Sequence, residues 1–277
     1  MRFWHRAPAP PLDVAIESIW CCENGPGARR LERVLPSGAA QLIVNLKEDQ
    51  TRTYSPDTGE LVQVSSGSIL AGMATRFQVI DTEEQEQVVG VAFRPGGTLP
   101  FFAEPAVELS DRDVPLEALW GPRATALLRE RLLAAPGPEA RLGLLEETLR
   151  SAFHERVAHP AVAFALADLR ARPAVARIAP LAAAAGLSAR RLSERFRAEV
   201  GMSPKRYCRI RRFQQVLTRT HQARRIDWST VALEGGFYDQ AHLIHEFQAF
   251  AGLTPTSYQT LSTPFQNHVR FLQDGLA

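Results

Sequence analysis

The sequence predicts an α+β protein of two domains, with a β-barrel-like N-terminal domain and an all-α C-terminal domain. Three observations lead to this prediction. Short segments rich in Val, Ile, Leu and Phe alternate with turn residues between positions 30 and 95. Leucines then recur at helical spacing over residues 123–153, and no strand pattern appears from residue 160 onward. The third observation is an internal repeat, in which LAAAAGLSARRLSERF at 181–196 is echoed by VALEGGFYDQAHLIHEF at 231–247.

Composition sets the outer limits of the prediction. A length of 277 residues allows two domains with cores of their own, and 45% hydrophobic with 22% charged residues is ordinary for a globular protein. No apolar run approaches the roughly 18 residues that would cross a bilayer, and the segment MRFWHRAPAPPLD lacks the apolar core of an export signal. Three cysteines are too few for a disulfide framework or a zinc site. We therefore expect a cytoplasmic protein that does not bind a membrane.

Five strand candidates define the N-terminal domain, which we predict over residues 1–115. They are LERVL, AQLIVNL, LVQVS, RFQVIDT and VVGVAF, separated by turns such as PSG, SPDTG and SSG. Short strands at regular intervals favour a small sandwich or barrel, and we predict a cupin-like barrel.

A helical hairpin is predicted over residues 116–157. Two stripes at helical spacing flank the breaker APGP, and they consist of Leu127, Leu128 and Leu132, then Leu142, Leu145, Leu149 and Phe153. Because two such stripes exceed what one end of a small barrel needs to bury, we expect the hairpin to support a homodimer. The alternative is that the stripes pack against each other.

Charge is distributed unevenly along the chain. Residues 159–261 hold 15 Lys and Arg against 7 Asp and Glu, a net charge of +8, whereas the remaining residues carry a net charge of −6. A basic part on an otherwise acidic chain indicates contact with a polyanion, although a solvated basic surface has the same composition.

The first copy of the repeat has the pattern of a helix-turn-helix motif at about residues 178–199. Gly186 supplies the freedom that a tight turn needs, and Ser188 is a good N-cap for the second helix. That helix buries one face and presents a polar, cationic face, which suits a major groove about 12 Å wide. The candidates for base contact are Arg190, Ser193, Glu194 and Arg197, with Arg191 beside them as a phosphate contact.

The second copy, at about residues 228–251, keeps this layout with one extra residue after its glycine. Its candidates for base contact are Gln240, Ile244, His245 and Gln248. Between the copies, Ser203 and Pro204 begin a basic helix that runs to about Thr220. From this helix we expect phosphate contacts by Lys205, Arg206 and Arg209.

Residues 159–261, including the first helix AVAFALADLRARP, resemble the DNA-binding domain of the AraC/XylS family of bacterial transcription regulators. The stretch GGFYDQAHLIHEFQAFAGLTPTSY carries the likeness almost position by position. The resemblance implies a domain over residues 158–262, with a C-terminal tail at 263–277. By position it implies base reading by Arg190, Ser193 and Glu194 in the first motif, and by Gln240, Ala241, Ile244 and His245 in the second. Ala241 and Ile244 cannot hydrogen-bond a base, so the second helix is expected to read less sequence, although Ile244 could touch a thymine methyl.

The resemblance also implies function and partners. It implies a sequence-specific transcription regulator that binds double-stranded DNA and contacts RNA polymerase. Two motifs in one chain imply an asymmetric site with two boxes about one helical turn apart. More faintly, ERVLPSGAAQLIVNL, VAFRPGG and LSDRDVPLEALWG resemble the barrel-like sensor domain of one subgroup of this family. That likeness implies an architecture that could take a small-molecule effector.

Other chemistry finds less support in the sequence. No histidine lies between His5 and His154, which argues against the catalytic metal of a cupin-like barrel, and we expect no metal, no cofactor and no enzymatic activity. Arg94 is a candidate for binding an anionic effector at the barrel mouth, with a structural ion pair as its alternative. Adjacent Cys21 and Cys22 fit burial better than thiol sensing.

Two alternative functions stay open. One is a DNA-modifying or repair enzyme fused to the DNA-binding module. The other is a ligand-independent regulator whose N-terminal half only dimerises or contacts polymerase.

Overall fold

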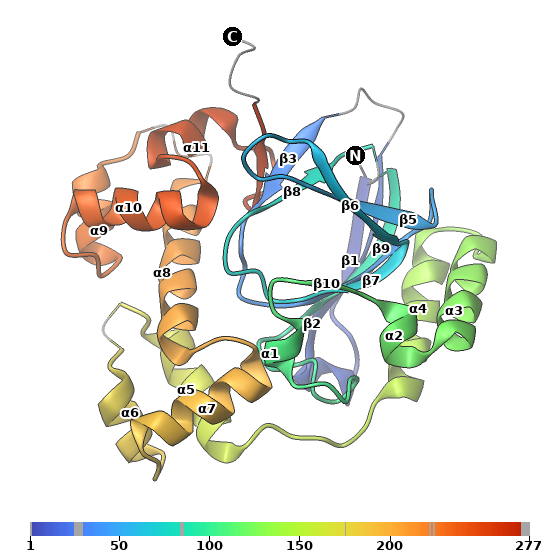
Figure 1. Cartoon of the computed structure of the whole chain (residues 1–277), viewed down its shortest axis with the longest axis horizontal. Helices are drawn as coiled ribbons and strands as arrows, with labels where there is room; N and C mark the ends of the chain where they lie inside the picture. Colours follow the sequence, from blue (N-terminus) through green and yellow to red (C-terminus); the bar gives the residue numbers. More distant parts are fainter. Residues whose placement is uncertain are drawn as a thin grey trace.

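A computed structural model of the chain describes residues 2–24, 30–83, 86–174, 176–221, 223 and 225–272. Strands dominate the chain up to residue 115, and helices dominate from residue 116 to residue 261. Figure 1 shows the strands beside the C-terminal helices, with the chain crossing from one part to the other below them. The predicted α+β fold with two architecturally distinct parts is confirmed.

The first sheet is antiparallel, with the strand order β1-β2-β9-β4-β7-β10. Its strands are β1 (Arg2–Arg6), β2 (Ile16–Glu23), β4 (Gln41–Asn45), β7 (Ser68–Ala71), β9 (Gln87–Phe93) and β10 (Asp113–Pro115), and the short 3-10 helix η1 (Leu12–Val14) precedes β2. Successive residues of a strand point to opposite faces. One face of this sheet is fully buried, as Ile19, Leu42 and Val91 demonstrate.

The second sheet has the order β11-β3-β8-β5-β6 and faces the first. It consists of β3 (Leu31–Val34), β5 (Gln50–Tyr54), β6 (Leu61–Ser66), β8 (Gln78–Asp81) and β11 (His268–Arg270). The two sheets form a barrel-like pair that does not close into a complete barrel. The predicted strand candidates correspond to β3, β4, β6, β8 and β9. The sequence pattern missed β1 and β2, which lie before residue 30, and the short strands β5, β7 and β10.

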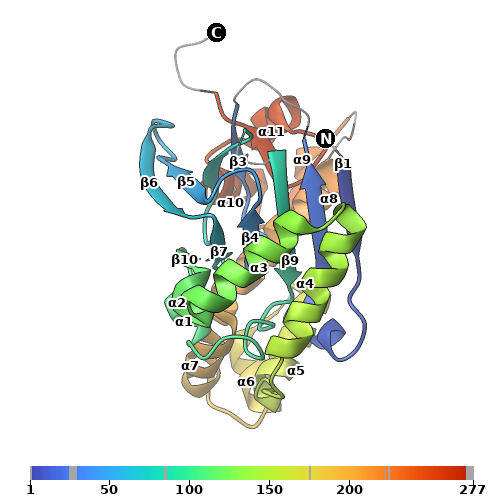
Figure 2. The same cartoon turned by 90° about the vertical axis from the view of Figure 1, so that its right-hand side faces the viewer.

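The predicted helical hairpin is present and is part of the core. After α1 (Ala106–Leu109) and α2 (Leu116–Trp120), it consists of α3 (Pro122–Ala134) and α4 (Pro138–Ala152). Figure 2 shows both helices lying across the first sheet, and α4 packs against β1 and β2. The stripe residues Leu128, Leu132, Leu142, Leu145 and Leu149 are all buried.

This burial removes the reason for expecting the hairpin to dimerise. Apart from Leu127, the leucines of the stripes are covered by the sheet and by each other, so they offer no continuous apolar face to a second copy. Leu127 and Leu133 are the leucines of this described segment that stay exposed, at 54% and 43%. The homodimer remains a prediction that the hairpin no longer supports.

The C-terminal part is a set of helices around one core. They are α5 (Pro160–Ala171), α6 (Ile178–Ala184), α7 (Ala189–Val200), α8 (Pro204–Thr220), α9 (Trp228–Glu234), α10 (Gln240–Ala251) and α11 (Pro255–Leu261). One continuous cluster of buried residues runs from the first sheet through the hairpin into these helices. Among the described residues, no helix is both long and apolar enough to span a membrane.

Several direct contacts join the helices to the sheets. The backbone N–H of Phe77 donates to the carbonyl of Phe250 at 2.9 Å, and the side-chain amide of Gln214 donates to the carbonyl of Pro36 at 2.8 Å. After α11 the chain returns to the second sheet, where β11 pairs with β3. The prediction that the chain is wholly helical beyond residue 160 is therefore wrong at residues 268–270. Three residues are too short to produce a strand pattern, and their pairing depends on a partner more than 200 residues away.

Candidate DNA-binding surface

The first motif is formed by α6, a tight turn and α7. Gly186 lies in the turn with φ of +70°, a conformation that favours glycine. The side-chain oxygen of Ser188 accepts a hydrogen bond from the backbone N–H of Arg191 at 3.3 Å and so caps α7. The residues Leu192, Phe196 and Val200 are buried. The predicted helix, turn and cap are present at these positions, and so is the inner face except for Ala189, which was expected on it and is exposed.

The outer face of α7 carries the predicted base-reading side chains. Arg190 and Glu194 lie one turn apart with side chains 88% and 59% exposed, and the guanidinium Nε lies 2.8 Å from the Glu194 carboxylate. This hydrogen bond raises the pKa of Arg190. Arg191 and Arg197 are exposed, whereas Ser193 is half-buried. The first motif therefore presents a mainly cationic face on which one arginine is already paired with an acid.

The second motif is formed by α9 and α10. Gly236 takes a φ of +73°, and a Cβ added there would lie only 2.7 Å from the Cα of Ala174. The carboxylate of Asp239 accepts from the backbone N–H of His242 at 2.7 Å and caps α10. Leu243, Phe247 and Phe250 are buried, as the periodicity predicts.

The predicted contact residues of α10 differ in exposure. Gln240, Ala241, His245 and Gln248 are exposed, whereas Ile244 is half-buried. Gln240 accepts a hydrogen bond from the hydroxyl of Ser229 at 3.2 Å, which joins the two helices of the motif. The outer face of α10 thus holds amide and imidazole groups and lacks the arginines of α7.

The helix α8 connects the two motifs, and most of its arginines bind protein groups. Two nitrogens of Arg209 lie 2.8 and 2.7 Å from the carboxylate of Glu246 on α10, and Glu246 is only 6% exposed. Arg212 donates to the carbonyl of Gly236 at 2.8 Å. The predicted phosphate contact by Arg209 does not fit this geometry, because its guanidinium neutralises a buried carboxylate.

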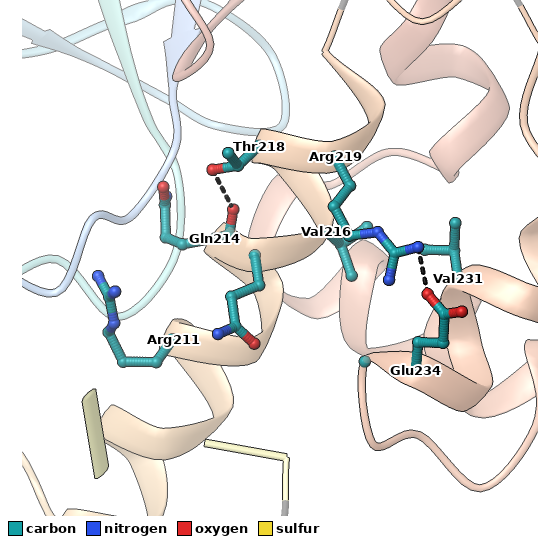
Figure 3. Close-up of a pocket in the computed structure, with 9 residues that line it drawn as sticks. Arg211, Gln214, Val216, Thr218, Arg219, Val231 and Glu234 are labelled. Atoms are coloured by element: carbon teal, nitrogen blue, oxygen red, sulfur yellow. Dashed lines mark hydrogen bonds and ion pairs between the residues drawn. The ribbon is translucent and has the colours of Figure 1, made fainter. Parts of the chain in front are cut away.

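A groove of about 570 Å³ separates α8 from α9. Figure 3 shows Arg219 of α8 reaching across it to form an ion pair with Glu234 of α9, while the hydroxyl of Thr218 donates to the carbonyl of Gln214. Arg219 therefore also binds α8 to the second motif. Lys205 and Arg206, at the start of α8, are exposed, and Arg206 reaches the carbonyl of Thr75 at 3.5 Å.

Sequence reasoning missed the role of Glu246, although a signal was available. Glu246 lies between Leu243, Phe247 and Phe250 on the apolar stripe of its helix. A glutamate in such a stripe is rarely buried without a partner. The connecting helix α8 carries several arginines, so a buried ion pair between α8 and α10 could be predicted, although the sequence does not say which arginine forms it.

Comparison with protein families decides the identity of this part. A family model described as "Helix-turn-helix domain" matches residues 181–260, a stretch that begins in α6 and ends in α11. The C-terminal part of the chain is an AraC-type helix-turn-helix domain. The match includes both motifs and the connecting helix. A second model, described as "Domain of unknown function (DUF6597)", matches residues 5–115 and thus both sheets except β11 and the first residues of β1.

Two solved structures of ToxT from Vibrio cholerae strain SCE256 are similar to the chain. An apo variant shares 8% identity at a TM-score of 0.47, with 95% of this chain and 98% of that chain covered. Wild-type ToxT with a bound unsaturated fatty acid shares 9% identity at a TM-score of 0.45, covering 96% of this chain and 99% of that chain. No curated protein matches this chain.

The remaining predicted sites lie outside the AraC-type domain. Arg94, the candidate for an anionic effector, donates from Nε to the backbone carbonyl of Asp13 at 2.9 Å. It does not line the cavity between the sheets, so the structure gives it a structural contact in place of the predicted one. Cys21 and Cys22 are buried on β2, and burial raises the pKa of both thiols. Within the described ranges, no group of three His, Cys, Asp or Glu side chains could hold a metal ion.

Proposed function

We propose that this protein is a sequence-specific transcription regulator that reads two successive major grooves with α7 and α10. The observation that carries the proposal is the pair of exposed second helices in one chain, each belonging to a capped helix-turn-helix motif. In such motifs the second helix enters the major groove with its N-terminal residues toward the base edges. Arg190 and Gln240 lie at those N-terminal positions.

The two helices offer different chemistry to DNA. Arginine recognises the acceptors of guanine, and glutamate accepts from the amino group of cytosine, so Arg190 and Glu194 suit a G·C-containing box once their mutual ion pair opens. Gln240, His245 and Gln248 suit adenine or mixed edges, and Ile244 suits a thymine methyl. We therefore propose two unlike boxes and an asymmetric site.

We further propose that the distance between the two boxes is nearly invariant. The connecting helix α8 has 17 residues, which corresponds to about 25 Å at 1.5 Å per residue. Successive major grooves on one face of the duplex are about 34 Å apart, and the width of the motifs supplies the difference. The bonds from α8 to Glu246, Gly236 and Glu234 support a stiff connection, because they hold the second motif against α8.

The test uses DNA sites selected from a random pool by the full-length chain. Half a helical turn, ~5 base pairs, is then inserted between the two selected boxes, and a full turn, ~10 base pairs, in a second duplex. The half-turn insertion should abolish the contribution of the second box, and the full-turn insertion should not restore it. Recovery of affinity with the full turn would contradict a stiff connection. Selection of a single short box would contradict reading by two helices.

A further inference from the structure

The space between the two sheets is not filled by side chains. On the first sheet, Trp20 and Ile43 alternate with fully buried neighbours and face the second sheet, yet both are only half-buried. Ile80 faces them from the second sheet and is also half-buried. Apolar side chains between two packed sheets are normally buried, and they fill the space about as densely as molecules in an organic crystal. Here they line a cavity of about 560 Å³, which falls in the range of small-molecule sites.

One wall of this cavity is aromatic. Phe3 stacks on Trp20 with the ring centroids 6.0 Å apart at 21°, and the ring of Phe265 lies 6.1 Å from that of Phe3 at a tilt of 58°. His268 continues the series, 6.0 Å from Phe265. Gly90 makes room for the indole, because a Cβ at this position would lie 2.4 Å from the ring of Trp20. Such a wall suits a flat, largely apolar molecule.

In the part of the chain that the structure describes, the lining carries no aspartate, glutamate, lysine or arginine. Two histidines, His221 and His268, line the cavity, and the imidazole of each already has a polar partner in the protein. Nδ1 of His268 lies 3.0 Å from the carboxylate of Glu32, and Nε2 of His221 lies 3.2 Å from the carbonyl of Pro264. A charged ligand would lose its hydration here without gaining an oppositely charged partner, which is costly. The cavity therefore favours an uncharged ligand, contrary to the anionic effector expected from Arg94.

Polar groups for such a ligand are available on the first sheet. Ser18 and Gln41 line the cavity from β2 and β4, and neither side chain has a hydrogen-bond partner among the residues that the structure describes. A hydroxyl and an amide can each donate and accept. They would orient a neutral molecule that carries a carbonyl, hydroxyl or amide group.

The DNA-binding part supplies the remaining wall. His221 follows α8 directly, residues 264–267 lie between α11 and β11, and His268 is the first residue of β11. The amide of Gln214 on α8 donates both to Pro36, at 2.8 Å, and to the side chain of Asn267, at 2.9 Å, and both of these partners line the cavity. A molecule in the cavity thus contacts groups bonded to the helix that holds both motifs.

We infer that this cavity binds an uncharged, flat aromatic small molecule, and that its occupancy is coupled to DNA binding through His221, residues 264–268 and α8. The inference of a binding site requires only the cavity, whereas the inference of coupling also requires the proposed function, DNA binding. If the ligand changes the affinity of the protein for DNA by some factor, DNA must change the affinity of the protein for the ligand by the same factor.

Two fluorescent probes that share one ring system test the class of ligand. N-phenyl-1-naphthylamine is neutral, and 1-anilinonaphthalene-8-sulfonate is the same molecule with a sulfonate. The full-length protein should bind the neutral probe at one site and about tenfold or more tighter than the anion. Equal affinity for the two probes, or binding of the anion alone, would overturn the assignment.

Three variants locate the site. Ala92 faces the cavity from β9, so Ala92→Phe should fill the space and weaken binding of the neutral probe about tenfold or more. Ala163→Phe is the matched control, since Ala163 is exposed on α5 and the same ring is added outside the cavity. Gln41→Lys places a cation in the wall and should shift the preference toward the sulfonate, a gain that misfolding cannot produce. Wild-type binding by Ala92→Phe, or an unchanged preference in Gln41→Lys, would place the probe elsewhere.

The coupling is measured with the DNA sites selected above. Saturating neutral probe should change the affinity for DNA about fivefold or more in the wild type, and DNA should change the affinity for the probe by the same factor. An unchanged DNA affinity with a bound probe would overturn the coupling but leave the site. Probe binding without any DNA binding would overturn the proposed function and not the site.

Discussion

The ion pair between Arg209 and Glu246 allows a direct test of how α8 holds the second motif. Replacing Arg209 with methionine keeps an unbranched side chain over the ring of Phe250, which lies 5.3 Å from the guanidinium carbon. The replacement removes both hydrogen bonds to Glu246, whose side chain is 8% exposed. The carboxylate is then left nearly buried without its partner.

The expected loss of stability is large for a single substitution. Removing one partner of a buried ion pair costs about 3–5 kcal/mol of unfolding free energy. The Arg209 side chain is 28% exposed, so water can reach the vacated position and we take the lower end, about 3 kcal/mol. For a chain of this length each kcal/mol lowers the melting temperature by about 2–4 °C, so Arg209→Met should melt about 6 °C or more below the wild type.

The dependence on pH has opposite signs in the two proteins. Burial would raise the pKa of Glu246, but the hydrogen bonds and charge of Arg209 outweigh it and hold this pKa below the ordinary value of 4.5. In the wild type this contribution to stability is present above pH 4.5 and is lost as the pH falls through the lowered pKa. In Arg209→Met only the charges of His242 and Arg212 still oppose burial, so burial, the largest influence, raises the pKa of Glu246 and the penalty is relieved as the pH falls through that raised pKa. The difference in melting temperature should therefore narrow on acidification.

Thermal unfolding of the full-length protein at neutral and acidic pH measures both effects. Arg195→Met is the matched control, because Arg195 is exposed on α7 and its replacement should change stability by only about 0.5 kcal/mol or less. Combining Arg209→Met with Glu246→Leu should recover much of the loss, since two apolar side chains leave no buried charge. Equal melting temperatures for Arg209→Met and Arg195→Met would contradict a stabilising ion pair. A difference between Arg209→Met and the wild type that widens on acidification would contradict it as well.

Three further predictions concern the motifs and the thiols. Arg190→Ala should weaken binding to the selected site about tenfold and relax one base position, and an equal loss on random DNA would indicate a phosphate contact. Ser188→Ala should lower the unfolding free energy by about 1 kcal/mol through loss of the cap on α7, and an unchanged melting curve would refute the role of the cap. Burial raises the pKa of Cys22 to about 11, so iodoacetamide should label it at neutral pH only on unfolding, and rapid labelling of the native protein would contradict its burial.

Local patterns in the sequence were sufficient for the elements of the DNA-binding part. The two glycines Gly186 and Gly236, the caps Ser188 and Asp239, and the apolar stripes of α7 and α10 are all short-range signals, and the structure has each of them in place. The leucine stripes likewise predicted the hairpin. In the N-terminal part, strands with a regular apolar pattern were predicted, and β1 and β2 were missed.

What the sequence could not determine depends on partners far along the chain. Arg209 of α8 looks like a phosphate contact until the carboxylate of Glu246 is seen beside it. The leucines of the hairpin look like a dimer interface until the first sheet covers them. Arg94 looks like an anion site until its nitrogen meets the carbonyl of Asp13. Periodicity shows which face of a helix is apolar or charged, but only tertiary packing decides whether that face meets another part of the chain, a second molecule or water, because the free energy of burial and of charge pairing depends on the neighbour.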